Sequence, residues 1–202
     1  MWRLGHPSGP LDFPPWDFWQ GNNRFDDTSG GFRTLYCAQE PLTCLREKLH
    51  PLRPKASAEH ARVFSDPARM PPGTVGAEMR RNNVLAPARI VLLRGELIDL
   101  EDLSVRRDLE HRHAALLETH GIAHLDISQL RSDQRFVTQT IARGLFRQGA
   151  SGILYRSNID SERCFALFET QAYLEPDGEA VPLTDPIPEL LQICDEFNLA
   201  LL

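Results

Sequence analysis

Short segments in which apolar and polar residues alternate recur along this chain, and a period of two predicts β-strands. We expect strands at residues 2–4, 32–38, 88–93 and 96–100, and then three consecutive strands in GILYRS, FALFE and QAYLE. A turn at Gly95 separates 88–93 from 96–100, so we expect these two to pair as a hairpin. The chain therefore contains a β-sheet of several strands.

Other segments repeat their apolar residues every three or four positions, which predicts amphipathic helices. A proline suits the first turn of a helix over residues 41–50, and a second helix is expected over Arg106–His120. A third helix opens at Ser132 as its N-cap and ends at Gly149, and the last covers about residues 188–199. Helices and strands together predict a mixed α+β fold.

Two stretches lack a clear period. The loop that carries Trp16, Phe18 and Trp19 is expected to pack as a lid or core cover. Residues 53–86 contain four prolines, so we expect irregular structure with a short helix around Ser57–Val63, which serves as a lid or a partner surface. No internal repeat or linker divides the chain, so we expect one domain over residues 1–202.

The composition excludes several classes of protein. Of the 202 residues, 42% are hydrophobic and 25% charged, as in an ordinary globular protein. The net charge of −6 has the wrong sign for binding a phosphate backbone, so nucleic acid is excluded as the main partner. Twenty of the 22 basic residues are arginine, which suits bidentate recognition of phosphate, although the codon use of a GC-rich genome accounts for most of them.

Targeting and metal-binding signals are missing from the sequence. It has neither an apolar run of 18 residues nor a secretory leader, so we expect a cytoplasmic protein without a membrane span. The four cysteines lack zinc-site spacing and are expected to be reduced and buried. His111 and His113 are two residues apart and face different sides of a helix, so we expect a solvated helix face and no metal site.

One carboxylate is placed by helical geometry. Leu42, Leu45 and Leu49 form the apolar stripe of the helix over residues 41–50. Glu47 lies about 140° around the helix axis from Leu42, at 100° per residue, so it points away from the stripe. The helical period alone predicts that Glu47 is a surface carboxylate.

Two segments combine glycines with a strand that carries polar residues at one end, a usual place for a site on a rigid element. They are GNNRFDDTSGGFRTLYCAQEPLTCLREKL and GASGILYRSNIDSERCFALFE. The sequence has no glycine-rich nucleotide-binding loop, hydrolase elbow or zinc-binding helix motif. Any site in these segments therefore belongs to a less familiar class.

In order and approximate spacing, the two segments resemble the RES domain, a family named for an Arg, a Glu and a Ser and found in NAD+-depleting toxins of bacterial toxin–antitoxin modules. The resemblance rests on RFDD around Arg24, LYCA around Tyr36, TCLRE ending in Glu47, the TQTIARGLF helix that leads to GASGILYRS with Ser157, and FALFE. It covers roughly residues 2–170 and leaves 171–202 as a C-terminal extension. It departs from the family at Asn22–Asn23, where a pair of glycines is usual.

The resemblance implies a fold like that of the ADP-ribosyltransferases, with a split mixed β-sheet flanked by helices. It implies that NAD+ binds in a cleft faced by Arg24, Tyr36, Glu47 and Ser157, with Glu47, Arg24 and Ser157 catalytic. Arg24 is expected to clamp the diphosphate, and Tyr36 to stack on nicotinamide and to offer its hydroxyl to a ribose. Glu47 is expected to bind ribose hydroxyls and stabilise the oxocarbenium-like cation, and Ser157 to orient the ribose or the amide.

The function implied first is a toxin that cleaves the nicotinamide–ribose bond of NAD+ as a glycohydrolase or phosphorylase. No cofactor beyond NAD+ is expected, and phosphate is a candidate acceptor beside water. Two alternatives stay open: a mono-ADP-ribosyltransferase that modifies a cellular protein, and an inactive RES-like module that binds a nucleotide or partner. The family also implies a helix-turn-helix (Xre-type) antitoxin as partner, and a homodimer stays open.

Overall fold

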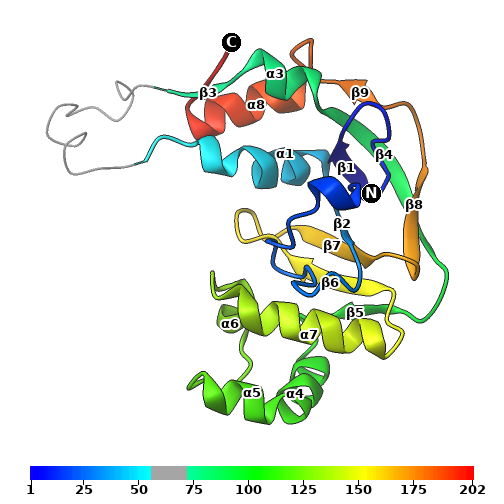
Figure 1. Ribbon diagram of the computed structural model, residues 1–202. Helices are drawn as coiled ribbons and strands as arrows, with labels where there is room; N and C mark the ends of the chain where they lie inside the picture. Colours follow the sequence, from blue (N-terminus) through cyan, green and yellow to red (C-terminus); the bar gives the residue numbers. More distant parts are fainter. Residues whose placement is uncertain (56–71) are drawn as a thin grey trace, which may run out of the picture.

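The computed structural model describes residues 1–55 and 72–202 (Figure 1). The strands are β1 (Trp2–Gly5), β2 (Thr34–Ala38), β3 (Gly73–Val75), β4 (Val84–Leu92), β5 (Leu97–Asp99), β6 (Gly152–Arg156), β7 (Arg163–Phe168), β8 (Ala172–Pro176), β9 (Val181–Pro182) and β10 (Leu199–Leu201). The helices are α1 (Pro41–Leu49), α3 (Ala77–Arg81), α4 (Leu103–Arg112), α5 (Ala114–Thr119), α6 (Ile127–Arg131), α7 (Arg135–Arg147) and α8 (Pro188–Phe197), with short 3-10 turns at Trp16–Phe18 and His50–Leu52. The predicted helix around Ser57–Val63 lies outside the described residues.

Most strands form one mixed sheet of eight strands. Its order is β5-β6-β7-β2-β1-β4-β8, with β9 also paired to β4. β5 and β6 run parallel, and the other pairs of this sheet are antiparallel. A second, two-stranded sheet pairs β3 with β10 in parallel. The predicted fold class, a mixed sheet flanked by helices, is confirmed.

The predicted hairpin between 88–93 and 96–100 is wrong. β4 pairs with β1 through Val84–Pro87 and with β8 through Ala88–Leu92, and β5 is not one of its partners. The chain turns at Gly95, whose φ is 54°, and β5 pairs instead with β6 at the opposite edge of the sheet. A local turn signal marked the end of the strand correctly but carried no information about its partner.

Both groups of helices cover the same face of the sheet. Successive side chains of a strand point to opposite faces, and on β2 Tyr36 and Ala38 contact the helical cores whereas Leu35 and Cys37 belong to the core on the other face. One group holds α1, α3 and α8, and the other holds α4 to α7 (Figure 1). Because the two groups meet the sheet at separate places, part of this face lies between them.

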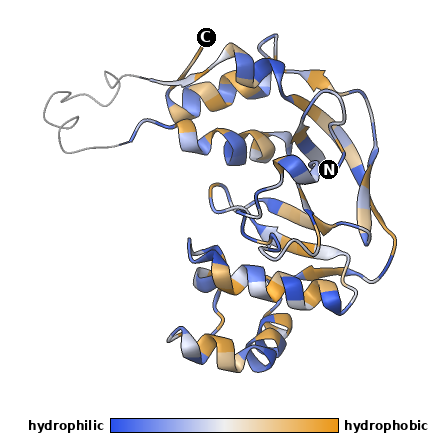
Figure 2. Ribbon diagram, in the orientation of Figure 1, coloured by the Kyte–Doolittle hydropathy of each residue, from blue (hydrophilic) through white to orange (hydrophobic). Residues whose placement is uncertain are grey.

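The α1–α8 group packs through apolar stripes. Leu45 and Leu49 of α1 are fully buried against Leu190 and Ile193 of α8, and polar residues occupy the outer sides of these helices (Figure 2). Burial of each such side chain contributes about 1.5–3 kcal/mol. The predicted helices over 41–50 and 188–199 are thus confirmed, with the second ending at Phe197.

The α4–α7 group differs from the prediction at two points. The helix expected over Arg106–His120 is broken at His113, so that α4 and α5 both bury a leucine, Leu109 and Leu117, in one core. Ser132 does not begin the next helix. Its hydroxyl donates to the Gln129 carbonyl oxygen at 3.0 Å and closes α6, and α7 begins three residues later.

Two further predictions are wrong. Residues 73–81 are regular rather than irregular, because β3 finds its partner in β10 at the far end of the chain, a pairing that no local pattern signals. In the aromatic loop Phe18 is 79% exposed and is not packed as a lid, whereas Trp16 lies under the Arg33 guanidinium at 5.1 Å. The expected burial of all four free cysteines is confirmed.

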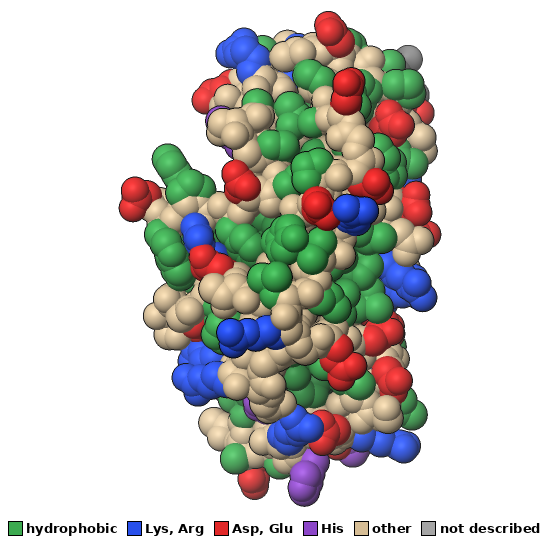
Figure 3. Space-filling model, turned by 90° about the vertical axis from the view of Figure 1, so that its right-hand side faces the viewer, with side chains coloured by type: hydrophobic (Ala, Val, Ile, Leu, Met, Phe, Trp, Pro, Cys, Tyr) green, Lys and Arg blue, Asp and Glu red, His purple; other side chains and the backbone are tan. Residues whose placement is uncertain are grey.

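The opposite face of the sheet has its own apolar core, to which Leu11 and Phe13 of the N-terminal loop add. Figure 3 views the side where β4 and β8 run in Figure 1, and hydrophobic side chains gather across the middle of it. Within the described segments, no helix has the length and apolar character needed to cross a membrane.

Candidate functional site

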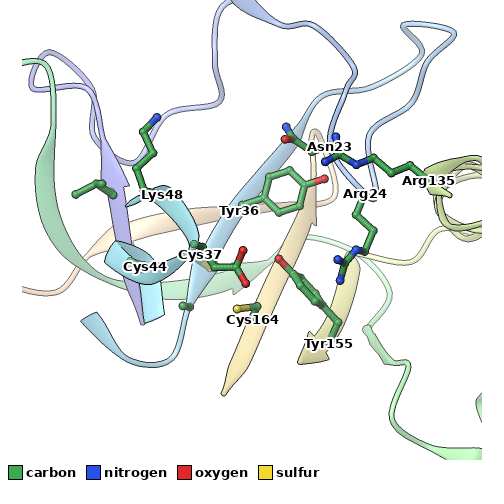
Figure 4. Close-up of a pocket in the computed structure, with 12 residues that line it drawn as sticks. Asn23, Arg24, Tyr36, Cys37, Cys44, Lys48, Arg135, Tyr155 and Cys164 are labelled. Atoms are coloured by element: carbon green, nitrogen blue, oxygen red, sulfur yellow. The ribbon is translucent and has the colours of Figure 1, made fainter. Parts of the chain in front are cut away.

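A cleft of about 370 Å³ opens on the helix-bearing face of the sheet, between the two helical groups. Its lining comes from the loop before β2, from β1, β2, α1, β6 and β7, and from the start of α7 (Figure 4). The lining residues are Leu4, Asn23, Arg24, Tyr36, Cys37, Ala38, Cys44, Glu47, Lys48, Arg135, Tyr155 and Cys164. Segments more than 130 residues apart in the chain thus form one site.

Tyr36 connects the sheet to the loop that carries Arg24. Its hydroxyl donates to Asp26 Oδ1 at 2.9 Å and accepts from the Phe25 backbone N–H at 3.0 Å. Burial, reinforced by the Asp26 charge, raises the pKa of Tyr36 well above its ordinary value. Tyr36 is therefore a neutral phenol with both hydrogen-bonding roles of its hydroxyl already used, and it offers the cleft its ring.

The loop around Arg24 is held from several sides. Buried Asp26 accepts from the backbone and side-chain nitrogens of Asn23 at 2.8 and 3.0 Å. Gln139 of α7 donates to the Asn23 carbonyl oxygen at 2.9 Å. Arg24 itself donates from one guanidinium nitrogen to Asn158 Oδ1 at 3.1 Å. Arg24 thus sits half-buried in the cleft wall on a rigid loop, with further N–H groups left for a ligand.

Glu47 and Lys48 enter the cleft from α1. The helix turns Leu45 and Leu49 into the core, which leaves the intervening Glu47 and Lys48 exposed. Periodicity correctly placed Glu47 opposite the packed stripe. The structure adds that this exposed side of α1 borders the cleft, so Glu47 is a carboxylate of the site wall.

The other aromatic group of the cleft is Tyr155 of β6. Its ring packs edge-on against Phe25 with 4.9 Å between ring centroids, and in Figure 4 its hydroxyl end lies close to the Arg24 guanidinium. Burial raises the pKa of Tyr155 well above its ordinary value, so it too is a neutral phenol. Cys164 of β7 lies at the floor of the cleft, where burial raises the pKa of its thiol. No thiolate nucleophile is available at that pKa.

The charges of the cleft are opposite to those of the whole chain. Its lining has three cationic side chains, Arg24, Lys48 and Arg135, against the single carboxylate Glu47. The chain as a whole carries −6. Arg135 also opens α7, a helix of 13 residues whose N-terminal backbone dipole adds positive potential on that wall. The arrangement suits an anionic ligand that also carries a cationic reacting centre.

Ser157, expected to face the cleft, is not among its lining residues. The residue is fully buried, and its hydroxyl accepts from the backbone N–H of Ile159 at 3.1 Å and of Asp160 at 3.4 Å. Three of the four residues singled out by the family resemblance, Arg24, Tyr36 and Glu47, therefore line one cleft, and Ser157 lies in the turn that follows β6.

Four polar lining residues were not singled out from the sequence: Asn23, Lys48, Arg135 and Tyr155. Tyr155 could have been found, because in the predicted strand GILYRS it lies two positions before Ser157, the residue that was expected to face the cleft. Lys48 and Arg135 carry no comparable signal, since an exposed basic residue on a helix is ordinarily a solvated one. Arg33 and Arg156, set aside as structural, bind Glu169 and the Ser161 carbonyl oxygen respectively.

A second hollow of about 500 Å³ lies over α4, α5 and the loop after them. Its lining contains Glu110 and Glu118, with small and apolar residues around them and no basic side chain. Within residues 1–55 and 72–202, no group of three or more His, Cys, Asp or Glu side chains is placed to hold a metal ion. The cleft between the helical groups is therefore the stronger candidate for an anionic ligand.

Comparison with known proteins identifies the family and the fold. The family model described as the RES domain matches residues 1–185. Among solved structures, a chain of the crystal structure of the M. tuberculosis MbcT–MbcA toxin–antitoxin complex superposes with a TM-score of 0.51, covering 97% of this chain and 86% of that one at 11% identity. At 11% identity, this structural similarity shows the fold alone. No curated protein sequence matches the chain.

Proposed function

Because this chain belongs to the RES domain family, we propose that it cleaves the nicotinamide–ribose bond of NAD+. The observation that carries the proposal is the convergence of Arg24 and Glu47 from separate segments into one cleft with an excess of positive charge. NAD+ combines a diphosphate with a cationic nicotinamide ribose, and the cleft offers cationic groups for the first and a carboxylate for the second. The volume, about 370 Å³, lies in the range of small-molecule sites.

In this proposal the cationic groups bind the diphosphate. Arg24 has free N–H groups beside its bond to Asn158 and can present them as a fork to phosphate oxygens. Arg135 and the start of α7 lie on the same side of the cleft (Figure 4). Together they supply a local positive potential that offsets the negative charge of the whole chain.

The proposed chemical step breaks the bond between ribose C1′ and the nicotinamide ring nitrogen. The electron pair of that bond leaves with the ring, which becomes neutral nicotinamide, and positive charge develops at C1′ in an oxocarbenium-like state. The Glu47 carboxylate stabilises this charge. Water then adds at C1′ and loses a proton to give ADP-ribose, or inorganic phosphate adds to give ADP-ribose 1″-phosphate. The reaction needs only NAD+ and an acceptor.

The two tyrosines have supporting roles. Both are neutral, so neither removes a proton, and their rings form an apolar surface on which a flat nicotinamide stacks. Since the Tyr36 hydroxyl is already paired, we propose stacking rather than ribose binding for this residue. Because Ser157 does not line the cleft, we propose that it acts indirectly, by shaping the turn after β6.

We further propose that the activity makes the protein a growth-arresting toxin of the cytoplasm, where the NAD+ pool is consumed. The structural neighbour comes from a toxin–antitoxin complex, which supports a cognate antitoxin, of the helix-turn-helix type that the family resemblance implies. The expected result is that induced expression arrests a bacterial host and that Arg24→Ala restores growth. Arrest that persists unchanged in Arg24→Ala would contradict the link between the cleft and toxicity.

The test compares Glu47 of α1 with Glu40, the residue directly before this helix. Glu47→Gln removes the charge in the cleft, whereas Glu40→Gln changes an exposed carboxylate at the other end of α1. Purified wild-type protein and Glu40→Gln are expected to release nicotinamide from NAD+ at equal rates, and Glu47→Gln about 10²–10³-fold more slowly. Equal rates in all three proteins would contradict the role of Glu47. NAD+ radiolabelled in the adenylate part leaves label on a polypeptide only if the acceptor is a protein.

A further inference from the structure

One turn contacts Arg24 and also the helix that carries Glu47. Residues 157–162, here called the β6–β7 turn, join β6 to β7 and close through a hydrogen bond from the Ser157 N–H to the Glu162 carbonyl oxygen at 2.9 Å. Asn158 of this turn accepts from Arg24 at 3.1 Å and donates to the Arg131 carbonyl oxygen at 2.8 Å. Asn158 therefore links Arg24 to the end of α6.

Asp160 of the same turn holds the helix that carries the carboxylate. Its Oδ2 accepts from the Thr43 hydroxyl at 2.8 Å and from the Arg46 guanidinium at 3.1 Å. Thr43 lies four residues before Glu47, one turn along α1, and Arg46 directly precedes it. The side chains of Asp160 and Arg46 are 12% and 17% exposed, so this ion pair is largely protected from solvent.

The remaining contacts of α1 are mostly apolar, apart from a weak hydrogen bond that the Cys44 thiol donates to the Trp2 carbonyl oxygen of β1 at 3.0 Å. Leu45 and Leu49 pack against α8 and β1, and these apolar contacts are non-directional. Arg46 also reaches Glu196 of α8 at 2.7 Å, which ties α1 to its neighbour and not to the sheet beneath the cleft. The bonds to Asp160 are directional, and they join α1 to the strands that carry Tyr155 and Cys164.

Ser157 gives the turn its shape. Its hydroxyl accepts from the N–H of Ile159 and of Asp160 and also hydrogen-bonds the Asp160 carboxylate, which helps to lower the pKa of that acid against the effect of burial. The buried serine thus positions the acid, and the acid positions the helix. This chain of contacts gives Ser157 a part in the site without contact with a ligand.

We propose that Asp160 is a positioning residue for Glu47, and that Asn158 of the same turn positions Arg24. The inference rests on the proposed function, because it assigns these residues to the reaction of the same cleft. A shift of about 1 Å in a reacting or stabilising group costs on the order of 10²-fold in rate. Loss of Asp160 is therefore expected to lower kcat, since Glu47 acts on the developing cation. Loss of Asn158 is expected to raise KM, since Arg24 binds the diphosphate.

The test measures kcat and KM for NAD+ in Asp160→Ala, Asp160→Asn and Asn158→Ala. We expect Asp160→Ala to lower kcat about 10²-fold with KM within about threefold, because Glu47 is displaced. Asp160→Asn keeps an acceptor for Thr43, so partial rescue to about a 10-fold loss is expected, and it serves as the folded variant if Asp160→Ala does not fold. Asn158→Ala is expected to raise KM with a smaller change in kcat.

Two controls separate positioning from a general loss of stability. Glu169→Gln breaks the ion pair between Glu169 and Arg33, which lies away from α1. The side chains of Arg33 and Glu169 are 18% and 21% exposed, so this pair is protected from solvent to a degree similar to that of the Asp160–Arg46 pair. Glu196→Gln removes the other partner of Arg46. Both are expected to keep kcat within about twofold of wild type. If Asp160→Ala and Asp160→Asn also keep the wild-type kcat, the inference is wrong.

Crystal structures of wild type and Asp160→Asn provide a measurement that does not depend on turnover. A rotation or shift of α1 relative to β2 that displaces Glu47 supports the inference, and superposition of α1 in the two structures overturns it. If wild type itself releases no nicotinamide, the proposed reaction fails, and the positions of α1 alone then decide whether Asp160 holds the helix.

Discussion

Tyr36→Phe removes one oxygen atom and tests how the Arg24 loop is held. The substitution leaves the ring in place but deprives the Phe25 N–H of its acceptor and Asp26 Oδ1 of its donor. Asp26 is 1% exposed, so water cannot easily replace the lost donor. An unsatisfied buried N–H costs about 1–3 kcal/mol, and a hydrogen bond to a charged group contributes about 1.5–3 kcal/mol. With partial relaxation we expect a loss of about 3 kcal/mol in the free energy of unfolding.

Urea unfolding measures this loss. With a slope of about 2 kcal/mol per molar urea, the midpoint should fall by about 1.5 M. Tyr173→Phe is the matched control, because Tyr173 is 40% exposed on β8, and it should shift the midpoint by less than about 0.3 M. A loosened loop should also raise KM for NAD+. A Tyr36→Phe protein with the midpoint and KM of wild type would refute the claim that this hydroxyl fixes the loop.

Three further predictions concern the fold. Gly152→Ala should destabilise the protein by more than 2 kcal/mol in urea unfolding, because a Cβ would lie 2.4 Å from the Ala166 carbonyl oxygen. Hydrogen bonds lower the pKa of Asp27 despite its burial, so the ionised carboxylate stabilises the fold above about pH 4 and this contribution is lost as the pH falls through the lowered pKa. The difference in unfolding free energy between wild type and Asp27→Asn should therefore shrink from about pH 7 to about pH 3. Burial raises the pKa of Cys37 and Cys44 to about 12, so at pH 8 a thiol reagent should label them in urea but not in native protein.

Local patterns predicted the elements more successfully than their partners. The strands that contain Tyr36 and Tyr155 and the helix with Glu47 follow from periods of two and of 3.6 residues, which are properties of the segment itself. The pairing of β5 with β6 and of β3 with β10 joins strands that are far apart in the sequence. No local period contains that information.

The candidate site, too, could be predicted from the sequence only in part. Helical geometry indicated that Glu47 points away from the packed stripe, but not that a cleft lies on that side. The family resemblance supplied Arg24 and Tyr36, and the structure places both in the lining. Arg135 could not be predicted, because its role depends on where α7 begins, and the sequence pattern placed the N-cap two residues too early, at Ser132 instead of Gln134. Asp160 escaped notice because its partners lie more than 110 residues away.

The most direct test of the central claim is a proton NMR time course of NAD+ with the purified chain, in buffer with and without inorganic phosphate. We predict that the resonances of bound nicotinamide decay as those of free nicotinamide rise in equal amount, while the ribose C1′ proton moves to ADP-ribose or, with phosphate, to its 1″-phosphate. Glu47→Gln should slow both changes together. An NAD+ spectrum that stays unchanged with folded protein under both conditions would contradict the account.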